Sequence, residues 1–153
     1  MKEIYLGGTC ANNRWREDIV IPALVERGVP EDAIFNPNLG TEGWNEAAQE
    51  TEDEVRGSCS LVVYYLGDTR DGTGVSFYSA MKAVMTLYDR PTDAFVVIDA
   101  SGTEGHVAMA LERAYRELKK RFPDANLADN LQDLITYVAD RYGRRQRLGG
   151  RDI

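Results

Sequence analysis

The residues of this chain that could do chemistry are concentrated in four short polar stretches, each of which follows an apolar run. The stretches are Gly7-Gly8-Thr9-Cys10, Asn36-Pro37-Asn38, Gly67-Asp68 through Gly74, and Asp99 through Gly105. They are rich in Gly, Asn, Asp, Ser and Thr, which form plain turns but also offer backbone N–H groups and side-chain oxygens to a ligand. Each stretch alone is typical of a turn, whereas the four together indicate one polar crevice for a small molecule.

Several familiar chemistries are excluded by spacing. The turn GGTCANN lacks the G-x-G-x-x-G pattern of a dinucleotide site, and no G-K-[ST] follows it as in a phosphate-binding P-loop. His106 is the only histidine, and we expect it to cap a helix or face water rather than serve a catalytic nucleophile. Carboxylates are abundant but do not combine with other ligand types at metal-binding spacing. We therefore expect no metal and no cofactor.

The loop GDTRDGTGVS, from Gly67 to Ser76, has the composition of an anion site. Its glycines allow backbone N–H groups to approach an anion closely, and the N-terminus of a following helix favours a phosphate or carboxylate. Arg70 in the same loop could pair with phosphate. The alternative is a flexible connection between a strand and a helix.

The elements that must position these loops alternate between apolar runs and helical patterns, which predicts a parallel sheet covered on both faces. Strands are expected at 3–6, 33–36, 61–67 and 94–99, with a weak fifth near Asn126. Helices are expected at 13–27, kinked or broken at Pro22, and at 44–56, 75–88, 105–122 and 127–142. The predicted fold is a single α/β, flavodoxin-like (Rossmann-like) domain over residues 1–153. We expect the strand order 2-1-3-4, with residues 61–66 central.

Composition limits the possible partners and surroundings. The chain has 153 residues and a net charge of −7, which argues against a nucleic-acid partner. No apolar run is long enough for a membrane helix, so no membrane partner is expected. Cys10 and Cys59 form no disulfide framework, and reduced thiols favour a cytoplasmic location. The basic tail, 141–153, is either a solvated helix end or a contact for an anion or a neighbouring subunit.

A family resemblance runs through several of these stretches, from Ile4 to Ile98. The run IYLGGT with WRED, then IFNPN, an acidic helix leading into SCSLVVYYLGD, and GTGVSFYSA resembles the nucleoside 2-deoxyribosyltransferase-like superfamily. That superfamily includes the deoxynucleoside-monophosphate N-glycosidases. The resemblance implies a flavodoxin-like sheet, a homodimer or larger assembly, and cleavage of the N-glycosidic bond of a nucleoside or nucleotide through a glutamate nucleophile.

The resemblance also implies roles for particular residues. Tyr5, Gly8 and Thr9 match the opening Y-x-x-G-[ST] and, with Gly7, would line the sugar and base, while Asn36 matches an F-N-P turn. Glu52 lies near the position at which members of the superfamily have an acid that acts on the leaving base. The nucleophile motif G-x-G-x-E contributes Gly72 and Gly74 as ligand contacts but has Ser76 in place of the glutamate, and Arg70 stands where a phosphate-holding serine is usual.

Ser76 separates the possible functions, because a retaining glycosyl transfer needs a carboxylate and a serine hydroxyl is no substitute without a base. In an enzyme, Glu52 or Asp71 would have to act at the sugar, with Tyr5 and Ser76 beside it. The alternatives are a non-catalytic nucleotide-binding relative and an interaction protein without a ligand. Trp15, Trp44 and the helix at 75–88 further predict a homodimer, unless both tryptophans belong to the core.

Overall fold

The computed structural model describes residues 1–10, 12–38, 45–70 and 75–149, and within them the chain folds around one parallel sheet. The strands are β1 (Ile4–Gly8), β2 (Ile34–Phe35), β3 (Leu61–Leu66), β4 (Ala94–Ile98) and β5 (Asn126–Ala128). The longer helices are α1 (Ile21–Glu26), α3 (Glu46–Ser58), α4 (Phe77–Asp89), α5 (Gly105–Arg121) and α6 (Leu131–Gly149). Short helical turns cover Arg16–Val20 and Glu31–Ala33.

The sheet has five strands in the order β2-β1-β3-β4-β5, and every neighbouring pair is parallel. All side chains of β3 and β4 are buried, which is why their sequences are almost continuously apolar. The predicted α/β fold, the order of its first four strands and the central place of β3 are confirmed.

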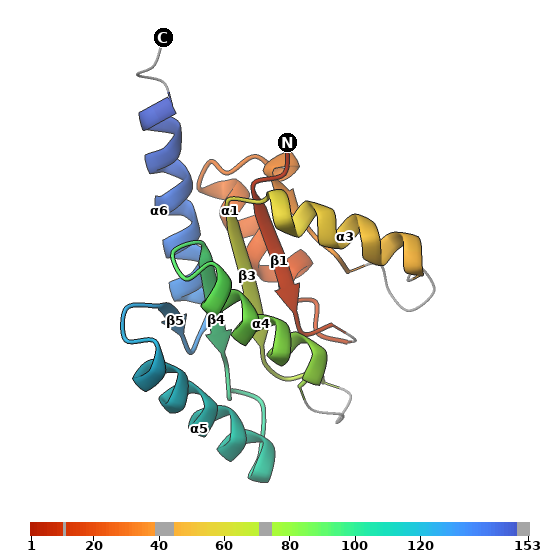
Figure 1. The fold of residues 1–153 in the computed structure, drawn as a ribbon, viewed down its shortest axis with the longest axis vertical. Helices are drawn as coiled ribbons and strands as arrows, with labels where there is room; N and C mark the ends of the chain where they lie inside the picture. The colour runs from red at the N-terminus through yellow and green to blue at the C-terminus, as the bar shows by residue number, and fades with distance from the viewer. Residues whose placement is uncertain (11, 39–44, 71–74, 150–153) are drawn as a thin grey trace.

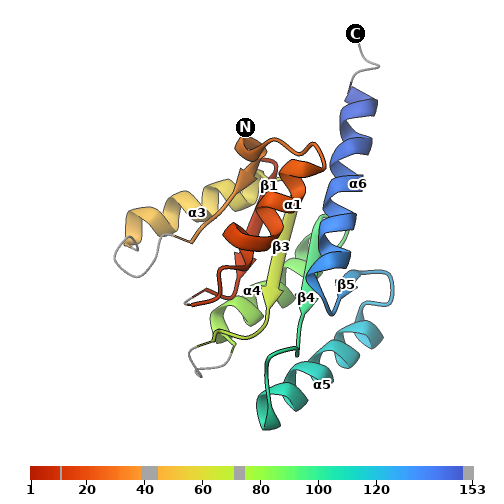
Figure 2. The same cartoon turned by 180° about the vertical axis from the view of Figure 1, so that it is seen from behind.

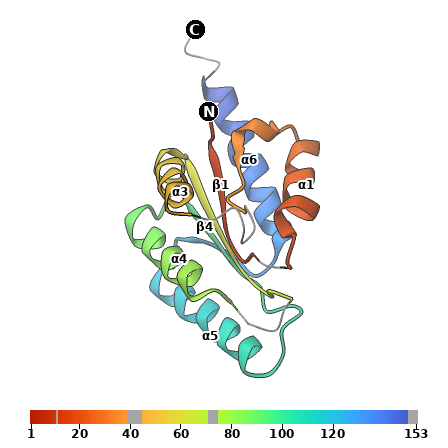
Figure 3. The same cartoon turned by 90° about the vertical axis from the view of Figure 1, so that its right-hand side faces the viewer.

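The helices form two layers (Figure 1). Figure 3 shows α3, α4 and α5 on one side of the sheet, with α1 and α6 on the other, and Figure 2 shows the α1 and α6 layer from behind. Each face has its own apolar core: Trp15, Leu24 and Leu134 belong to one, and Tyr5 and Tyr64 to the other. Because all strands run in one direction, the loops that follow them meet at one edge of the sheet.

Three sequence expectations need correction. Residues 126–128 pair with β4 as strand β5, so the last helix begins at Leu131 rather than at residue 127. The first helical segment covers residues 15–26 rather than 13–27: it is π-helical over Arg16–Val20 and α-helical from Ile21, and Pro22 lies in the first turn of α1. Trp15 is 1% exposed and packs in the core, so it offers no interface, and Trp44 lies outside the described residues.

A further correction concerns the acidic helix, which starts two residues later than the predicted 44–56 segment. Asn45 is the N-cap of α3, and its side chain accepts a hydrogen bond of 2.8 Å from the amide of Ala48. Across the described ranges, no helix is both long and apolar enough to cross a membrane.

Candidate functional site

The first feature of the candidate site is a pair of side chains that joins β1 to α3. The hydroxyl of Tyr5 donates a hydrogen bond to Oε1 of Glu52. Tyr5 is almost fully buried, and burial, reinforced by the Glu52 contact, raises the pKa of its phenol well above the usual range. The phenol therefore stays a neutral donor, and it holds a half-buried carboxylate at a fixed place.

Aromatic rings surround this pair. The Tyr5 ring stacks on Phe35 of β2 with centroids 5.9 Å apart, and Tyr64 of β3 is tilted against it at 6.0 Å. Gly7 is required between the rings, because a Cβ there would lie 2.6 Å from Tyr5 Cε1 and 2.8 Å from Tyr64 Cε1. The guanidinium of Arg56 lies 5.8 Å from the Tyr5 ring centroid. We call Tyr5, Phe35, Glu52, Arg56 and Tyr64 the Tyr5 site.

Unpartnered polar atoms are concentrated around the Tyr5 site. In the part of the chain that the structure describes, three buried side-chain atoms have no hydrogen-bond partner: Glu17 Oε2, Arg56 Nη1 and the Tyr64 hydroxyl. Arg56 and Tyr64 flank Tyr5 directly and lie close enough to act on each other: burial raises the pKa of the Tyr64 phenol, and the Arg56 guanidinium opposes that rise. Buried polar groups are normally paired, so a cluster of exceptions indicates a place for a bound polar molecule.

Glu17 lies on the helical turn Arg16–Val20, which precedes α1. Its Oε1 accepts hydrogen bonds of 3.1 Å from the side-chain amides of Asn36 and Asn38. Burial alone raises the pKa of Glu17, but these amides and a backbone N–H outweigh it and hold the pKa below its ordinary value. Asn36, predicted to contact substrate, therefore lies beside Phe35 and is engaged with an ionised carboxylate.

Arg16 braces the end of β1 from the other face of the sheet. It is fully buried and donates to the backbone oxygens of Leu6, Gly8 and Thr9 at 2.7, 3.1 and 2.9 Å. Trp15 Nε1 donates to the same Thr9 oxygen at 2.7 Å, and its ring lies 4.5 Å from the Arg16 guanidinium. Burial lowers the pKa of Arg16. This cation holds the glycine turn in place from behind.

The turn itself uses its small residues for close packing between strands. Gly8 has φ +116°, and a Cβ on it would lie 2.0 Å from the Tyr65 carbonyl oxygen. The Thr9 hydroxyl donates to the Gly67 oxygen at 3.1 Å and accepts from the Gly67 amide at 3.0 Å. Gly8 and Thr9 thus join the ends of β1 and β3, and a direct ligand contact for either stays a prediction.

Ser76 has a structural partner. It is the N-cap of α4, and its exposed side chain accepts a hydrogen bond of 3.3 Å from the amide of Ser79. Arg70 is exposed at the end of the loop after β3, with φ +61° and its amide bonded to Asp68 Oδ1 at 2.8 Å. Asp71, Gly72 and Gly74, the other predicted residues of this loop, lie outside the described residues.

A second buried carboxylate lies at the same edge of the sheet. Asp99 follows β4, and its Oδ2 accepts a 3.0 Å hydrogen bond from the hydroxyl of Tyr65. Its Oδ1 accepts from the amide and hydroxyl of Ser101 at 2.9 and 2.5 Å. Burial and then Asp99 raise the pKa of Tyr65, so this phenol also stays protonated. The contacts order the loop after β4.

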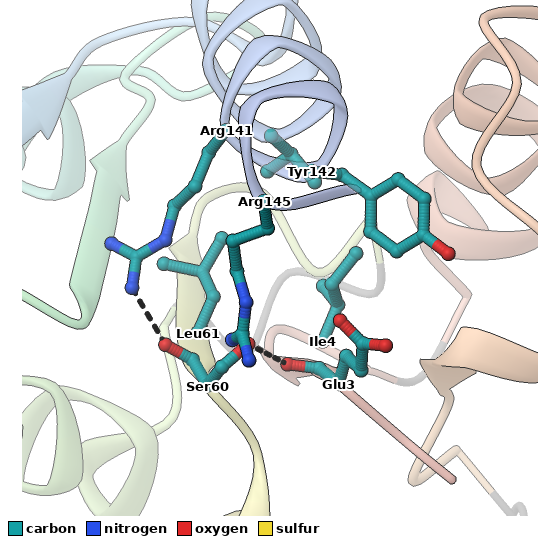
Figure 4. Close-up of a pocket in the computed structure, with 8 residues that line it drawn as sticks. Glu3, Ile4, Ser60, Leu61, Arg141, Tyr142 and Arg145 are labelled. Carbon is teal, nitrogen blue, oxygen red and sulfur yellow. Dashed lines mark hydrogen bonds between the residues drawn. The ribbon is translucent and has the colours of Figure 1, made fainter. Parts of the chain in front are cut away.

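Among the residues that the structure describes, three cavities lie away from the Tyr5 site, and one of about 350 Å³ is beside Asp99, between the loop after β4 and α5. Figure 4 shows a pocket at the opposite edge of the sheet, where Arg141 donates to the Ser60 oxygen at 2.7 Å. Its volume of about 10 Å³ suits one water molecule. A larger hollow of about 600 Å³ between α1 and α6 is open and is lined by Arg27, Arg144 and Arg147.

A groove of about 210 Å³ between α3 and α4 continues from the Tyr5 site. Arg56 lines it together with Lys82, Thr86 and Met85 of α4. One turn earlier on α3, the Gln49 amide donates to the Tyr78 hydroxyl at 3.4 Å, so the two helices touch above the groove. The groove brings α4, which Ser76 begins, next to the helix that carries Glu52.

Sequence reasoning named Tyr5, Glu52 and Asn36 as site residues but gave no role to Arg16, Glu17, Arg56 or Tyr64. The two adjacent tyrosines in β3 were an available signal, because alternate strand positions face opposite layers and each buried phenol needs a partner. Arg16 lies in the WRED run quoted for the resemblance, but neither it nor Arg56 carried a signal of burial, since arginines on helices are ordinarily exposed.

His106 is exposed, as one of its two predicted placements required. No group of three His, Cys, Asp or Glu side chains within the described ranges has the arrangement of a metal site. Comparisons with protein-family models, curated proteins and solved structures found no match.

Proposed function

We propose that this chain binds a nucleoside or nucleotide at the Tyr5 site and cleaves or transfers its N-glycosidic bond, with Glu52 as the acting carboxylate. The single observation that carries the proposal is the hydrogen bond from Tyr5, which fixes the half-buried carboxylate of Glu52 beside Arg56 and Tyr64. Arg56 Nη1 and the Tyr64 hydroxyl offer donors to a polar ligand, beside the half-buried ring of Phe35.

The chemistry proposed for Glu52 follows from its surroundings. Glycosidic cleavage passes through an oxocarbenium-like centre, which a carboxylate captures or stabilises, and it needs a proton for the departing base. Glu52 is half-buried, and Tyr5 orients one of its oxygens. Within the described residues Oε2 of Glu52 has no hydrogen-bond partner, so one oxygen remains for the substrate.

A second candidate function, binding without turnover, is favoured by Ser76. The Ser76 hydroxyl caps α4 by accepting a hydrogen bond from the Ser79 amide. In the resembled family, the nucleophile glutamate occupies the position of Ser76. If the reaction needs two carboxylates, Asp71 is the sequence neighbour able to supply the second. Without it, the Tyr5 site recognises a nucleotide and releases it unchanged.

Base release decides between the two functions. We expect a panel of nucleosides and 5′-nucleotides, followed by chromatography of the free base, to identify at least one substrate. Glu52→Gln lowers release about a hundredfold or more, because it removes the acid-base group. Glu54→Gln, an exposed position on the same helix, is the matched control and leaves release unchanged.

Thermal melting read on the same samples separates the remaining outcomes. A melting shift without base release supports the binding function and contradicts the enzyme. A ligand at a hundred times its dissociation constant stabilises the fold by about 2.7 kcal/mol. No shift with any member of the panel at millimolar concentration contradicts both functions.

We also propose that the chain forms a homodimer or larger assembly and works in the cytoplasm. Large apolar side chains exposed along α4 support self-association. A monomer mass by light scattering at micromolar concentration contradicts the assembly. Cys59 is buried, where burial raises the pKa of its thiol to about 11, and Cys10 is exposed and unpaired, which fits a reducing compartment.

A further inference from the structure

The outer face of α4 carries a continuous apolar stripe. Its members share one side of the helix, opposite the buried Ser79, Ala83 and Leu87. They are Phe77, Tyr78, Met81, Val84, Met85 and Tyr88, which we call the α4 stripe, and Phe77 is 84% exposed. Spacings of three, four and seven residues put these side chains on one face. Aromatic and methionine side chains of this kind are enriched in protein interfaces.

The helices on either side of the α4 stripe carry opposite charge. Figure 3 shows α4 between α3 and α5 in one layer, and both contacts are direct: Gln49 bonds Tyr78 at 3.4 Å, and Arg121 bonds Tyr88 at 3.1 Å. The exposed acids of α3 are Glu46, Glu50, Asp53 and Glu54, and this helix has no exposed base. The exposed bases of α5 are Arg113, Arg116, Lys119, Lys120 and Arg121, against the exposed acids Glu112 and Glu117.

We propose that the α4 stripe packs against the α4 stripe of a second copy of this chain, with the two α4 helices parallel and the two-fold axis running along them. An isologous pair has its two-fold axis in the plane of the interface. When that axis lies along α4, rotation exchanges the two sides of the layer. The acidic α3 of each copy then faces the basic α5 of the other copy, so the dimer has two such α3–α5 contacts.

The other two-fold arrangement has its axis across α4 and makes the helices antiparallel. It places α3 opposite α3 and α5 opposite α5, so like charges meet along both borders of the stripe. Facing like charges cost free energy and suppress the wrong arrangement, whereas complementary charges favour the right one. The charge pattern therefore selects the parallel pair.

This inference deepens the proposed self-association and adds a consequence for the Tyr5 site. In a parallel pair, the two-fold axis keeps the position along α4 unchanged, so the two Tyr5 sites lie at the same level along the dimer axis. The inference does not depend on the nucleoside proposal. Oligomeric state and base release are measured separately, so the dimer proposal can be wrong while the nucleoside proposal holds, and the reverse.

Charge reversal tests the pairing of α3 with α5. Glu50→Lys with Glu54→Lys makes the α3 variant, and Arg113→Glu with Lys120→Glu makes the α5 variant. Sedimentation of the unmodified protein should give a dimer whose dissociation constant rises with salt. Each variant alone should raise that constant about tenfold or more, and the chain carrying all four changes should return towards the original value. Glu26→Lys with Glu31→Lys, exposed on the other side of the sheet, matches the charge change of the α3 variant and should leave the constant unchanged.

Cysteine cross-linking tests the direction of the helices independently. In a Cys10→Ser background, Phe77→Cys should form a disulfide-linked dimer with itself, because a parallel pair brings equal positions together. Residues 77 and 88 are about 16 Å apart along the helix axis, far beyond disulfide reach. Cross-linking only in a mixture of Phe77→Cys and Tyr88→Cys chains overturns the parallel arrangement. A monomer at all concentrations, or no recovery in the four-change chain, overturns the proposal.

Discussion

Single residues at the edge of the sheet act mainly by satisfying backbone atoms that would otherwise be exposed or unpaired. Arg16 is the strongest example, because a fully buried guanidinium is paired with carbonyl oxygens rather than with a carboxylate. A buried charge costs several kcal/mol unless hydrogen bonds compensate it. Arg16 is compensated by hydrogen bonds to three carbonyl oxygens at the end of β1, so the shape of the turn after β1 depends on this side chain.

We predict that Arg16→Met lowers the free energy of unfolding by about 2–4 kcal/mol, because the buried carbonyls of Leu6 and Gly8 lose a charged donor. Urea unfolding measures the change. Arg14→Met is the control, since Arg14 is exposed and its ion pair with Asp18 contributes about 0.5 kcal/mol or less. If both variants lost a similarly small free energy of unfolding, Arg16 would not be stabilising the end of β1.

Glu17 gives a prediction on pH. Its folded-state pKa is lowered, so ionised Glu17 stabilises the fold above the unfolded-state pKa of about 4.3, and this contribution disappears as the pH falls through the folded-state value. We expect the unmodified protein to be more stable than Glu17→Gln at pH 7, and the difference to close in acid. Denaturant unfolding at several pH values measures it. A difference that stays constant down to pH 3 would count against an ionised Glu17 bonded to Asn36 and Asn38.

At the scale of elements, the residues that connect a strand to the next helix can have either a structural or a chemical role. The start of α4 shows this, because one serine stands both where the resembled family has its nucleophile and at the N-cap of the helix. Capping and catalysis make different demands on this hydroxyl, so they can be separated by substitution.

We predict that Ser76→Ala costs about 1 kcal/mol of unfolding free energy through loss of the cap, while Ser76→Asp keeps most of it. Equilibrium unfolding of the two variants measures the difference. Base release, if the unmodified protein shows it, should persist in both. A Ser76→Ala variant of full stability that releases no base would reassign Ser76 as a chemical group.

The elements were largely predictable from sequence, and their junctions were not. The apolar runs of β3 and β4 stand out because both faces of those strands are covered. Strand β5 has only three residues and a mixed pattern, so its pairing with β4 decides its conformation. The family resemblance assigned Tyr5 and Glu52 to one site, but the contact between them was not predicted, because it joins residues 47 positions apart and leaves no local pattern.

At the scale of the whole molecule, the two edges of the sheet have different tasks. The edge where the strands begin is closed by α6: Arg141 bonds the carbonyls of Ser60 and Thr92 at 2.7 and 2.6 Å and pairs with Asp93 at 2.7 Å. The edge where the strands end carries the polar loops that follow β1, β3 and β4, whereas Arg56 lies near the start of β3. The strand order made the location of this second edge predictable, but not the contacts of the side chains that lie there.

The central claim is that the Tyr5 site accepts a nucleoside-like ligand, and mapping backbone amide shifts by NMR tests it most directly. During titration with a 5′-nucleotide, we expect saturable shifts at Gly7, Asn36 and Glu52 and along the start of α4, and we expect Glu52→Gln to reduce them. Saturable shifts confined to Arg27, Arg144 and Arg147 would place the ligand in the open hollow between α1 and α6. That result, or no saturable shift with any nucleoside or nucleotide at millimolar concentration, would contradict the account.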